Sequence, residues 1–250
     1  MDKYYLLGGI ILIIIIVILV YYRQKDEPSL NNTNEIITRD TTMKDTVTKH
    51  TYYINLKHRT DRKLDTLREL QSFGIHNPTR FDAIKDDFGA IGCSKSHLEV
   101  LKIARKNNYP YVTIIEDDIQ FLNPKKTIQS LNNILNSKIP WDVILIGGNN
   151  YPPYQKINDD CIKVNNCQCC TAYIVKQSYY DTLINHWQKG LQKLIETNDI
   201  PNYALDQYWK ILQKKDNFIL ITPLKVVQRE SYSDIERKNV NYVDMMKNIK

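Results

Sequence analysis

From Thr51 onward, the chain alternates short apolar runs with amphipathic segments. The apolar runs are rich in β-branched and aromatic residues, which is typical of buried strands. The amphipathic segments repeat apolar residues every three or four positions, as Leu64, Leu67 and Leu70 do, which indicates helices packed on one face. The pattern predicts strands at 52–56, 79–84, 111–115, 141–146, 161–164, 171–175, 218–221 and 226–227. It predicts helices at 64–73, 93–106, 124–135, 178–194 and 203–214.

Strand and helix alternate regularly up to residue 146, where Gly147-Gly148-Asn149-Asn150 is expected to end the strand. This order predicts an α/β fold, with a mainly parallel sheet flanked by helices. Ligands of such folds bind at the carboxyl ends of the strands. The segment 149–154 matches no motif and is a candidate for the acceptor side of a site there.

The first residues differ from the rest, because Tyr4–Tyr22 contains no charged side chain. At about 1.5 Å per residue this run reaches about 28 Å, close to the hydrocarbon thickness of a bilayer. Tyrosines at both ends, followed by Arg23 and Lys25, suit the membrane interfaces. A cleaved signal peptide would need a shorter apolar region and an Ala-x-Ala-like site, which does not follow Val20. We therefore expect one uncleaved transmembrane signal-anchor helix at 4–22; the flanking charges leave its orientation open.

Residues 23–50 are polar and show no sustained apolar period, so we expect a disordered stem there and a folded domain at 51–250. The net charge of +6 is spread along the chain without a basic block. This distribution argues against nucleic acid as a partner, while a mildly basic surface suits anionic ligands or a membrane face.

Four of the five cysteines lie between Cys161 and Cys170. The Cys-x-Cys-Cys spacing lacks the Cys-x2-Cys pairs of zinc sites, so we interpret this group as packing residues. A disulfide from Cys161 across the Asn165-Asn166 turn stays open, and Cys93 is also read as a packing residue.

Glu116-Asp117-Asp118 stands directly after the apolar run 111–115. Clustered carboxylates at a strand end repel one another unless a cation or a proton offsets them. Mg²⁺ or Mn²⁺ would do so and would in turn bind a diphosphate. A solvated acidic turn is the alternative, and the position at the end of a strand is what favours a site.

Four sequence blocks and a closing segment occur in an order that we recognise: 53–62 (YINLKHRTDR), 92–97 (GCSKSH), 114–118 (IIEDD), 205–208 (LDQY) and 228–235 (QRESYSDI). Together they resemble glycosyltransferase family 25, which includes bacterial lipooligosaccharide galactosyltransferases and procollagen galactosyltransferases. The resemblance spans about 52–235. It implies a GT-A-like nucleotide-sugar-binding fold and transfer of a hexose, typically galactose, from a UDP-sugar to a hydroxyl of a glycan or protein. It further implies assistance by Mn²⁺ (or Mg²⁺) and inversion, with 51–250 as the catalytic domain.

The matching blocks supply the candidate site residues. For the metal we expect Asp118 and Glu116, which share one side of an extended segment, while Asp117 points the other way. For the donor we expect Asn55, Arg59, Arg62, Ser96, His97 and Asp117. An Arg fork suits phosphate oxygens, and Ser96 and His97 are expected to open a helix whose N-terminus favours anions. For the general base we expect Asp206, which lies among apolar and aromatic residues that raise the pKa of a carboxylate, with Asp234 as a second candidate.

Two other functions stay open at this point. A silent membrane-anchored binding or envelope protein would keep the fold, but the intact acidic triplet argues against it. A metal-dependent phosphohydrolase would also cluster carboxylates at strand ends, yet it needs more acids or histidines to hold two ions than this chain offers.

The uncharged Tyr4–Tyr22 run leads to a first prediction. The full chain should sediment with membranes and resist extraction by alkaline carbonate, because a spanning helix is held by its buried apolar surface. Immunoblotting of the membrane and soluble fractions checks this, and recovery in the soluble fraction would contradict the anchor.

Overall fold

The structure, a computed structural model, describes residues 42–247. Its elements are α3 Thr42–Thr48, β1 Thr51–Asn55, α4 Thr60–Ser72, β2 Thr79–Asp82, α5 Gly89–Lys106, β3 Tyr111–Glu116, β4 Ile119–Phe121, α6 Pro124–Asn136, β5 Val143–Asn150, β6 Tyr154–Lys156, β7 Cys161–Val164, β8 Cys167–Lys176, the 3-10 turn Gln177–Tyr179, α7 Tyr180–Thr197, α8 Ile200–Tyr203, α9 Leu205–Tyr208, α10 Lys210–Gln213, β9 Phe218–Ile221, β10 Val226–Gln228, β11 Ser231–Ser233, β12 Lys238–Val240 and α11 Val243–Lys247. The predicted transmembrane helix at 4–22 lies outside the described residues, as does the stem up to residue 41. Within 42–247, no helix is both long enough and apolar enough to span a membrane.

Eight strands form one mixed sheet in the order β2-β1-β3-β8-β5-β9-β7-β6. β1 pairs in parallel with β2 and β3, and β5 pairs in parallel with β9. β8 runs antiparallel between β3 and β5, and β7 runs antiparallel to β9 and β6. All strands except β8 and β7 therefore run in one direction. The α/β fold with a mostly parallel sheet, predicted from the element order, is confirmed.

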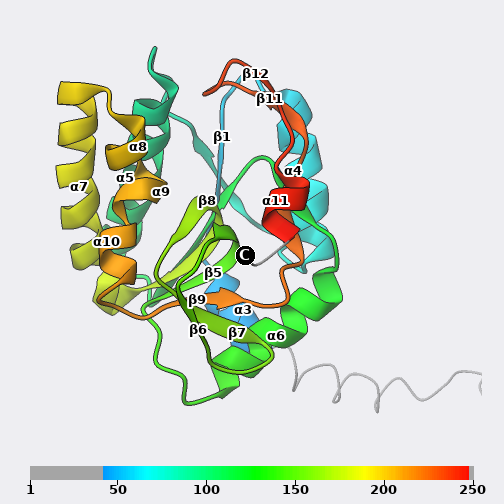
Figure 1. The fold of residues 1–250 in the computed structure, drawn as a ribbon. Helices are drawn as coiled ribbons and strands as arrows, with labels where there is room; N and C mark the ends of the chain where they lie inside the picture. Colours follow the sequence, from blue (N-terminus) through cyan, green and yellow to red (C-terminus); the bar gives the residue numbers. More distant parts are fainter. Residues whose placement is uncertain (1–41, 248–250) are drawn as a thin grey trace, which may run out of the picture. The chain divides into compact units, whose positions relative to one another are not determined.

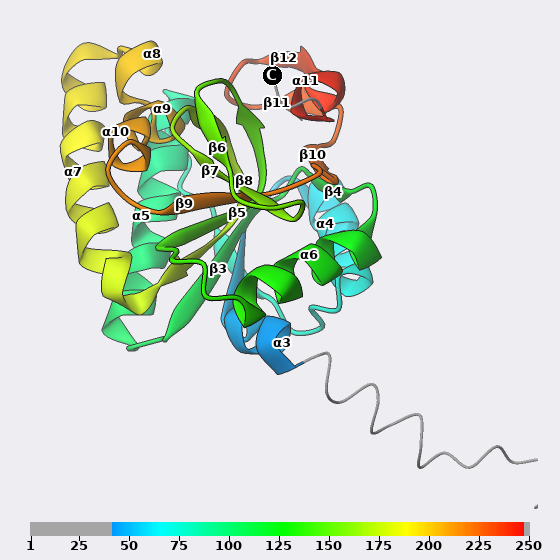
Figure 2. The ribbon, with the colours of Figure 1, turned by 60° about the horizontal axis from the view of Figure 1, so that its bottom comes forward.

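Helices cover both faces of the sheet (Figures 1 and 2). α5 and α7 pack on one face, and α4 and α6 pack on the other. Successive residues of β3 divide between the two faces, because Ile114 belongs to the core under α5 and α7 whereas Ile115 belongs to the core under α4 and α6. Burial on both faces explains why these strands read as unbroken apolar runs.

β5 continues through the segment that was expected to stop it. A Cβ added at Gly147 would lie 2.9 Å from Val226 Cγ1, and one at Gly148 would lie 2.6 Å from Cys167 Sγ. The two glycines therefore allow neighbouring strands to approach closely instead of ending the strand. The register of β5 against β8 shifts at this point, as irregular strands with glycine do.

The C-terminal part differs most from the pattern-based prediction. The helix expected at 203–214 is divided into the short helices α9 and α10, preceded by α8. β4 and β10 pair into a small second sheet, and β11 and β12 form a hairpin beyond it. Of these four strands, β10 was predicted, at 226–227. β4, β11 and β12 were not, because three residues are too few to show a period.

The folded part begins earlier than expected, since helix α3 occupies the end of the segment expected to be a disordered stem. Val47 is 2% exposed and belongs to the core under α4 and α6. The hydroxyl of Thr113 in β3 donates to the Val47 carbonyl at 2.9 Å. The seven residues of α3 are too few to show a helical period in the sequence.

Val47→Ala should therefore lower the free energy of unfolding by about 2 kcal/mol, because it leaves a cavity in a closed core. Lys49→Ala, at an exposed position just after α3, should change it little. Urea unfolding followed by circular dichroism compares the two variants. Equal midpoints would show that α3 is not part of the cooperative unit.

Candidate functional site

A cavity of about 920 Å³ opens at the carboxyl ends of β1 and β3. These strands are parallel neighbours, so their ends meet at one edge of the sheet. The site residues predicted from the sequence all line this cavity except Asn55 and Arg59. Those two contact residues of its wall, as described next.

Asn55, the last residue of β1, is 1% exposed and uses its whole amide inside the protein. Its Nδ2 donates to Asp117 Oδ2 at 2.7 Å and to the Arg59 carbonyl at 3.0 Å. Its Oδ1 accepts from Arg80 Nε at 3.0 Å. Asn55 therefore fixes the position of Asp117, and its amide is not presented to the cavity.

Arg62, near the start of α4, contacts both aspartates of the acidic triplet. Its Nη1 donates to Asp117 Oδ1 at 2.7 Å and lies 3.5 Å from Asp118 Oδ2. Its Nη2 donates to Ser231 Oγ at 2.6 Å and to the Tyr232 carbonyl at 2.9 Å. One guanidinium thus joins the turn after β3 to the C-terminal hairpin.

The triplet itself is not extended throughout. β3 ends at Glu116, and Asp117 and Asp118 form the turn that leads to β4. Strict alternation of side chains therefore stops at Glu116, and Asp117 and Asp118 both face Arg62. The expectation that Asp117 points away from Asp118 is wrong for this reason.

Asp118 carries the least compensated carboxylate. Its Oδ1 is buried and makes no hydrogen bond within residues 42–247. Burial, and then the negative charge of Glu116, raise the pKa of Asp118 to about 7. A cation next to Oδ1 would give this oxygen the partner that it lacks and would offset the repulsion between the carboxylates.

The charges that line the cavity also favour a bound cation. Glu116, Asp117, Asp118 and Asp206 all line the cavity. Of the lysines and arginines that the structure describes, Arg62 alone lies within 4.0 Å of a carboxylate of the triplet. Carboxylate oxygens are the ligands that Mn²⁺ and Mg²⁺ take in proteins, so this donor set fits such an ion.

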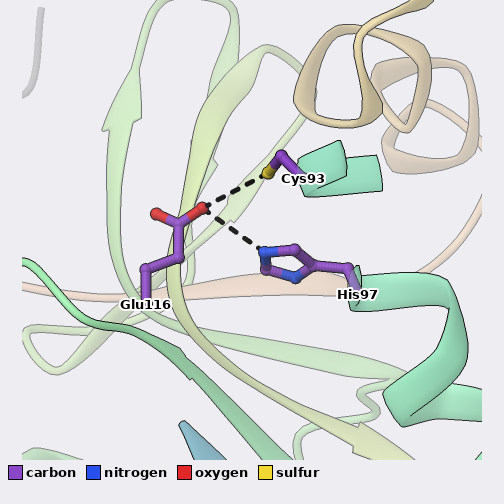
Figure 3. A group of neighbouring side chains, drawn as sticks. All are labelled: Cys93, His97 and Glu116. Carbon is purple, nitrogen blue, oxygen red and sulfur yellow. Dashed lines mark hydrogen bonds and ion pairs between the residues drawn. The ribbon is translucent and has the colours of Figure 1, made fainter. Parts of the chain in front are cut away.

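Glu116 is contacted by three side chains from other elements, of which Figure 3 shows Cys93 and His97. Gln228 Nε2 donates to its Oε2 at 3.2 Å. Its Oε1 lies 3.4 Å from His97 Nε2 and 4.0 Å from Cys93 Sγ. Cys93, read as a packing residue from the sequence, therefore belongs to the site. Its spacing of four from His97, which places both on one face of a helix, was the available signal.

Ser96 and His97 do not open a helix, because α5 already begins at Gly89. Ser96 Oγ donates to the Gly92 carbonyl at 2.7 Å and accepts from the Ile84 amide at 2.8 Å, which ties α5 to the end of the β2 segment. The His97 side chain is 1% exposed, and its Nδ1 lies 2.7 Å from the Tyr173 hydroxyl. Ser96 and His97 therefore do not place a helix N-terminus at the site, as the sequence had suggested.

Asp206, on the short helix α9, has the properties that its sequence context predicted. Its Oδ2 accepts from the Cys169 amide at 2.9 Å and from Gln207 Nε2 at 3.2 Å. Burial raises the pKa of Asp206, which makes the ionised carboxylate a better proton acceptor.

Arg59 and Asp234 are paired with each other. Arg59 Nη1 donates to Asp234 Oδ2 at 2.6 Å, and Arg59 Nη2 donates to Asp61 Oδ2 at 2.9 Å. His58 Nε2 lies 3.5 Å from the other oxygen of Asp234. The expected phosphate ligand and the second candidate base therefore meet in an ion pair that holds the β11–β12 hairpin to the start of α4.

The five cysteines, all within the described residues, are free, so the disulfide left open for Cys161 is not formed. Cys169 and Cys170 line the cavity together with Cys93.

Residues 87–209, which carry α5, the acidic triplet and Asp206, match the family model described as glycosyltransferase family 25 (LPS biosynthesis protein). This match confirms the resemblance to glycosyltransferase family 25 that the ordered motifs gave. It supports glycosyl transfer as the activity and names neither the sugar nor the acceptor. No curated protein matches the chain.

Similar solved structures include A197 from STIV, with 14% identity and a TM-score of 0.38 over 80% of this chain and 94% of that one. A glycosyltransferase involved in glycosylation of the major capsid of PBCV-1 has 10% identity and a TM-score of 0.38, covering 69% and 92%. The catalytic domain of Drosophila beta1,4-galactosyltransferase 7, in complex with xylobiose, has 10% identity and a TM-score of 0.41, covering 78% and 76%. Such low scores support no inference about this chain.

The role of Asn55 can be tested by stability. Asn55→Ala should lower the free energy of unfolding by about 1–3 kcal/mol, because it leaves buried polar partners without a hydrogen bond. The matched control is Asp82→Ala, which removes the exposed partner of the same Arg80 and should cost less than about 1 kcal/mol. Chemical denaturation of both variants checks the difference. A loss for Asn55→Ala no larger than that of Asp82→Ala would contradict the positioning role.

Proposed function

We propose that this protein transfers a hexose, with galactose as the first candidate, from a UDP-sugar to a hydroxyl of a glycan or protein acceptor. In this proposal the α/β domain is a GT-A-like fold, the reaction is metal-assisted, and the anomeric configuration is inverted. The match to the family 25 model supports glycosyl transfer. The single observation that carries the finer proposal is the buried, unsatisfied Asp118 oxygen in an acidic cavity at the strand ends.

Asp118 and Glu116 are the residues that we assign to the metal. Mn²⁺ or Mg²⁺ bound to their oxygens would offset the negative charge that develops on the departing UDP. Asn55 and Arg62 hold Asp117 from two sides, so the turn that carries Asp118 is fixed before any ligand arrives. Such preorganisation is what makes a charged group effective in a water-poor site.

Arg62 is the cationic group of the wall that we assign to the diphosphate of the donor. It lines the cavity, and its planar fork matches phosphate oxygens. Its Nε is buried and makes no hydrogen bond to any described residue. This leaves one donor of the guanidinium for a ligand oxygen.

Asp206 is the residue that we assign as general base. Its carboxylate would accept the proton of the acceptor hydroxyl, whose oxygen then attacks the anomeric carbon on the face opposite the departing UDP. One such displacement inverts the configuration. The amide hydrogen bond from Cys169 orients Asp206, and burial raises the pKa of this carboxyl, which makes the carboxylate a better proton acceptor. Asp234 is less suited, because Arg59 already neutralises it.

The assignment of Asp118 predicts the effect of an isosteric change. With the full chain, UDP-hexoses and Mn²⁺, Asp118→Asn should slow the release of UDP by about 10²-fold or more while the melting curve stays close to wild type. Glu116→Gln should cost less. Initial rates against Mn²⁺ concentration, measured for each UDP-hexose, provide the comparison and identify the sugar.

The matched control is Asp159→Asn, an acid whose side chain is 96% exposed outside the cavity. Its rate should equal that of the wild type. If Asp118→Asn turns over at the wild-type rate with unchanged metal dependence, the assignment fails. If no UDP-hexose supports release of UDP by the wild type, the proposed donor class fails.

A further inference from the structure

Three different ligand atoms converge on one side of the cavity (Figure 3). Cys93 Sγ and His97 Nε2 come from successive turns of α5, and Glu116 Oε1 comes from the end of β3. The three atoms all lie within 4.8 Å of one another. Sulfur, imidazole nitrogen and carboxylate oxygen together are a donor set of transition-metal sites, and softer than the all-oxygen set at Asp118.

His97 is directed at this point by its surroundings. Its ring stacks on Tyr173 and meets Trp187 edge-on, and its Nδ1 is 2.7 Å from the Tyr173 hydroxyl. Its Nε2 is buried and makes no hydrogen bond within residues 42–247, although Glu116 Oε1 is 3.4 Å away. A metal-binding histidine has this arrangement, in which the second ring nitrogen is held by a polar neighbour and orients the first.

The separations between the atoms are also informative. A direct N–H···O hydrogen bond spans about 2.7–3.2 Å, so the 3.4 Å between His97 Nε2 and Glu116 Oε1 is too long for a good one. Around a tetrahedral zinc ion, with bonds of about 2.0–2.3 Å, neighbouring ligand atoms lie about 3.3–3.6 Å apart. The 3.4 Å between His97 Nε2 and Glu116 Oε1 matches that spacing, whereas Cys93 Sγ, 4.0 Å from the same oxygen, lies beyond it. The three groups surround a common centre, and a small shift of the Cys93 side chain would bring all three to ligand distance.

We propose that Cys93, His97 and Glu116 form a binding site for a thiophilic divalent cation of the Zn²⁺ class, which shares Glu116 with the oxygen site at Asp118. Binding exchanges the thiol proton of Cys93, which passes to solvent, for the sulfur–metal bond. His97 then donates from Nδ1 to the Tyr173 oxygen, and Gln228 holds the second oxygen of Glu116. Three protein ligands leave a fourth position open toward the cavity, as in zinc sites that bind a small molecule.

Cobalt(II) is the probe that tests this site, because it replaces zinc and its bond to a thiolate gives a charge-transfer absorption in the near ultraviolet. Titration of the reduced full chain with Co²⁺ should produce this absorption, and added Zn²⁺ should displace it. Cys93→Ser should abolish it. Cys169→Ser, which changes another thiol of the same cavity, should leave it unchanged. The measurement needs no turnover, so it stands apart from the test of the proposed transferase reaction.

Two further variants cover the case in which Cys93→Ser does not fold, as judged by its melting curve without metal. His97→Gln should weaken Co²⁺ binding by about tenfold or more, and Tyr173→Phe should weaken it by a similar factor, because loss of a supporting contact costs about 10–100-fold. The absence of thiolate absorption in the wild type would overturn the proposal. So would absorption that persists in Cys93→Ser, that is lost equally in Cys169→Ser, or that is unchanged in His97→Gln.

Discussion

The geometry of the site depends on the sharing of one guanidinium between a buried carboxylate, Asp117, and a partly buried one, Asp118. Arg62 contacts Asp117 and Asp118 from the start of α4, and it also binds the backbone of the C-terminal hairpin. Burying two neighbouring carboxylates costs several kcal/mol unless they are paired. A lysine could not replace Arg62, because its single ammonium lacks the planar set of donors that reaches partners on several sides. The turn after β3, the start of α4 and the hairpin are therefore positioned together or not at all.

The sequence was most informative where the structure follows from local patterns. The run 111–115 lies between the two helix layers, so its residues are almost all apolar and predict a strand. Because β1 and β3 are parallel neighbours, the residues just after each run were bound to meet. The acidic triplet could be placed at a ligand site for that reason. The same reasoning failed one residue further, at Asp117, where the strand ends and the direction of a side chain is set by the turn.

Other features depended on partners that no local pattern contains. Gly147 and Gly148 read as a stop signal, and only the neighbouring strands show that they are sites of close approach. Arg59 has the residue type of a phosphate ligand, yet Asp234, 175 positions later, occupies it. Cys93 was interpreted as a packing residue. A thiol can either pack in a core or bind a ligand, and only its neighbours in the fold show which role applies. Residue chemistry indicated the site, whereas the assignment of individual roles needed the tertiary contacts.

The ion pairs of the C-terminal hairpin have a consequence for biosynthesis. Arg59 and Arg62 bind residues 169–175 positions further along the chain. A ribosome that has released the segment up to α7 has already exposed the acidic turn, but the hairpin that closes over Arg62 does not yet exist. Contacts between distant segments form late, because the entropy of closing a long loop must be overcome first. The nascent chain would thus form most of its sheet before its site, and the site would be complete only once residues 231–240 have left the ribosome.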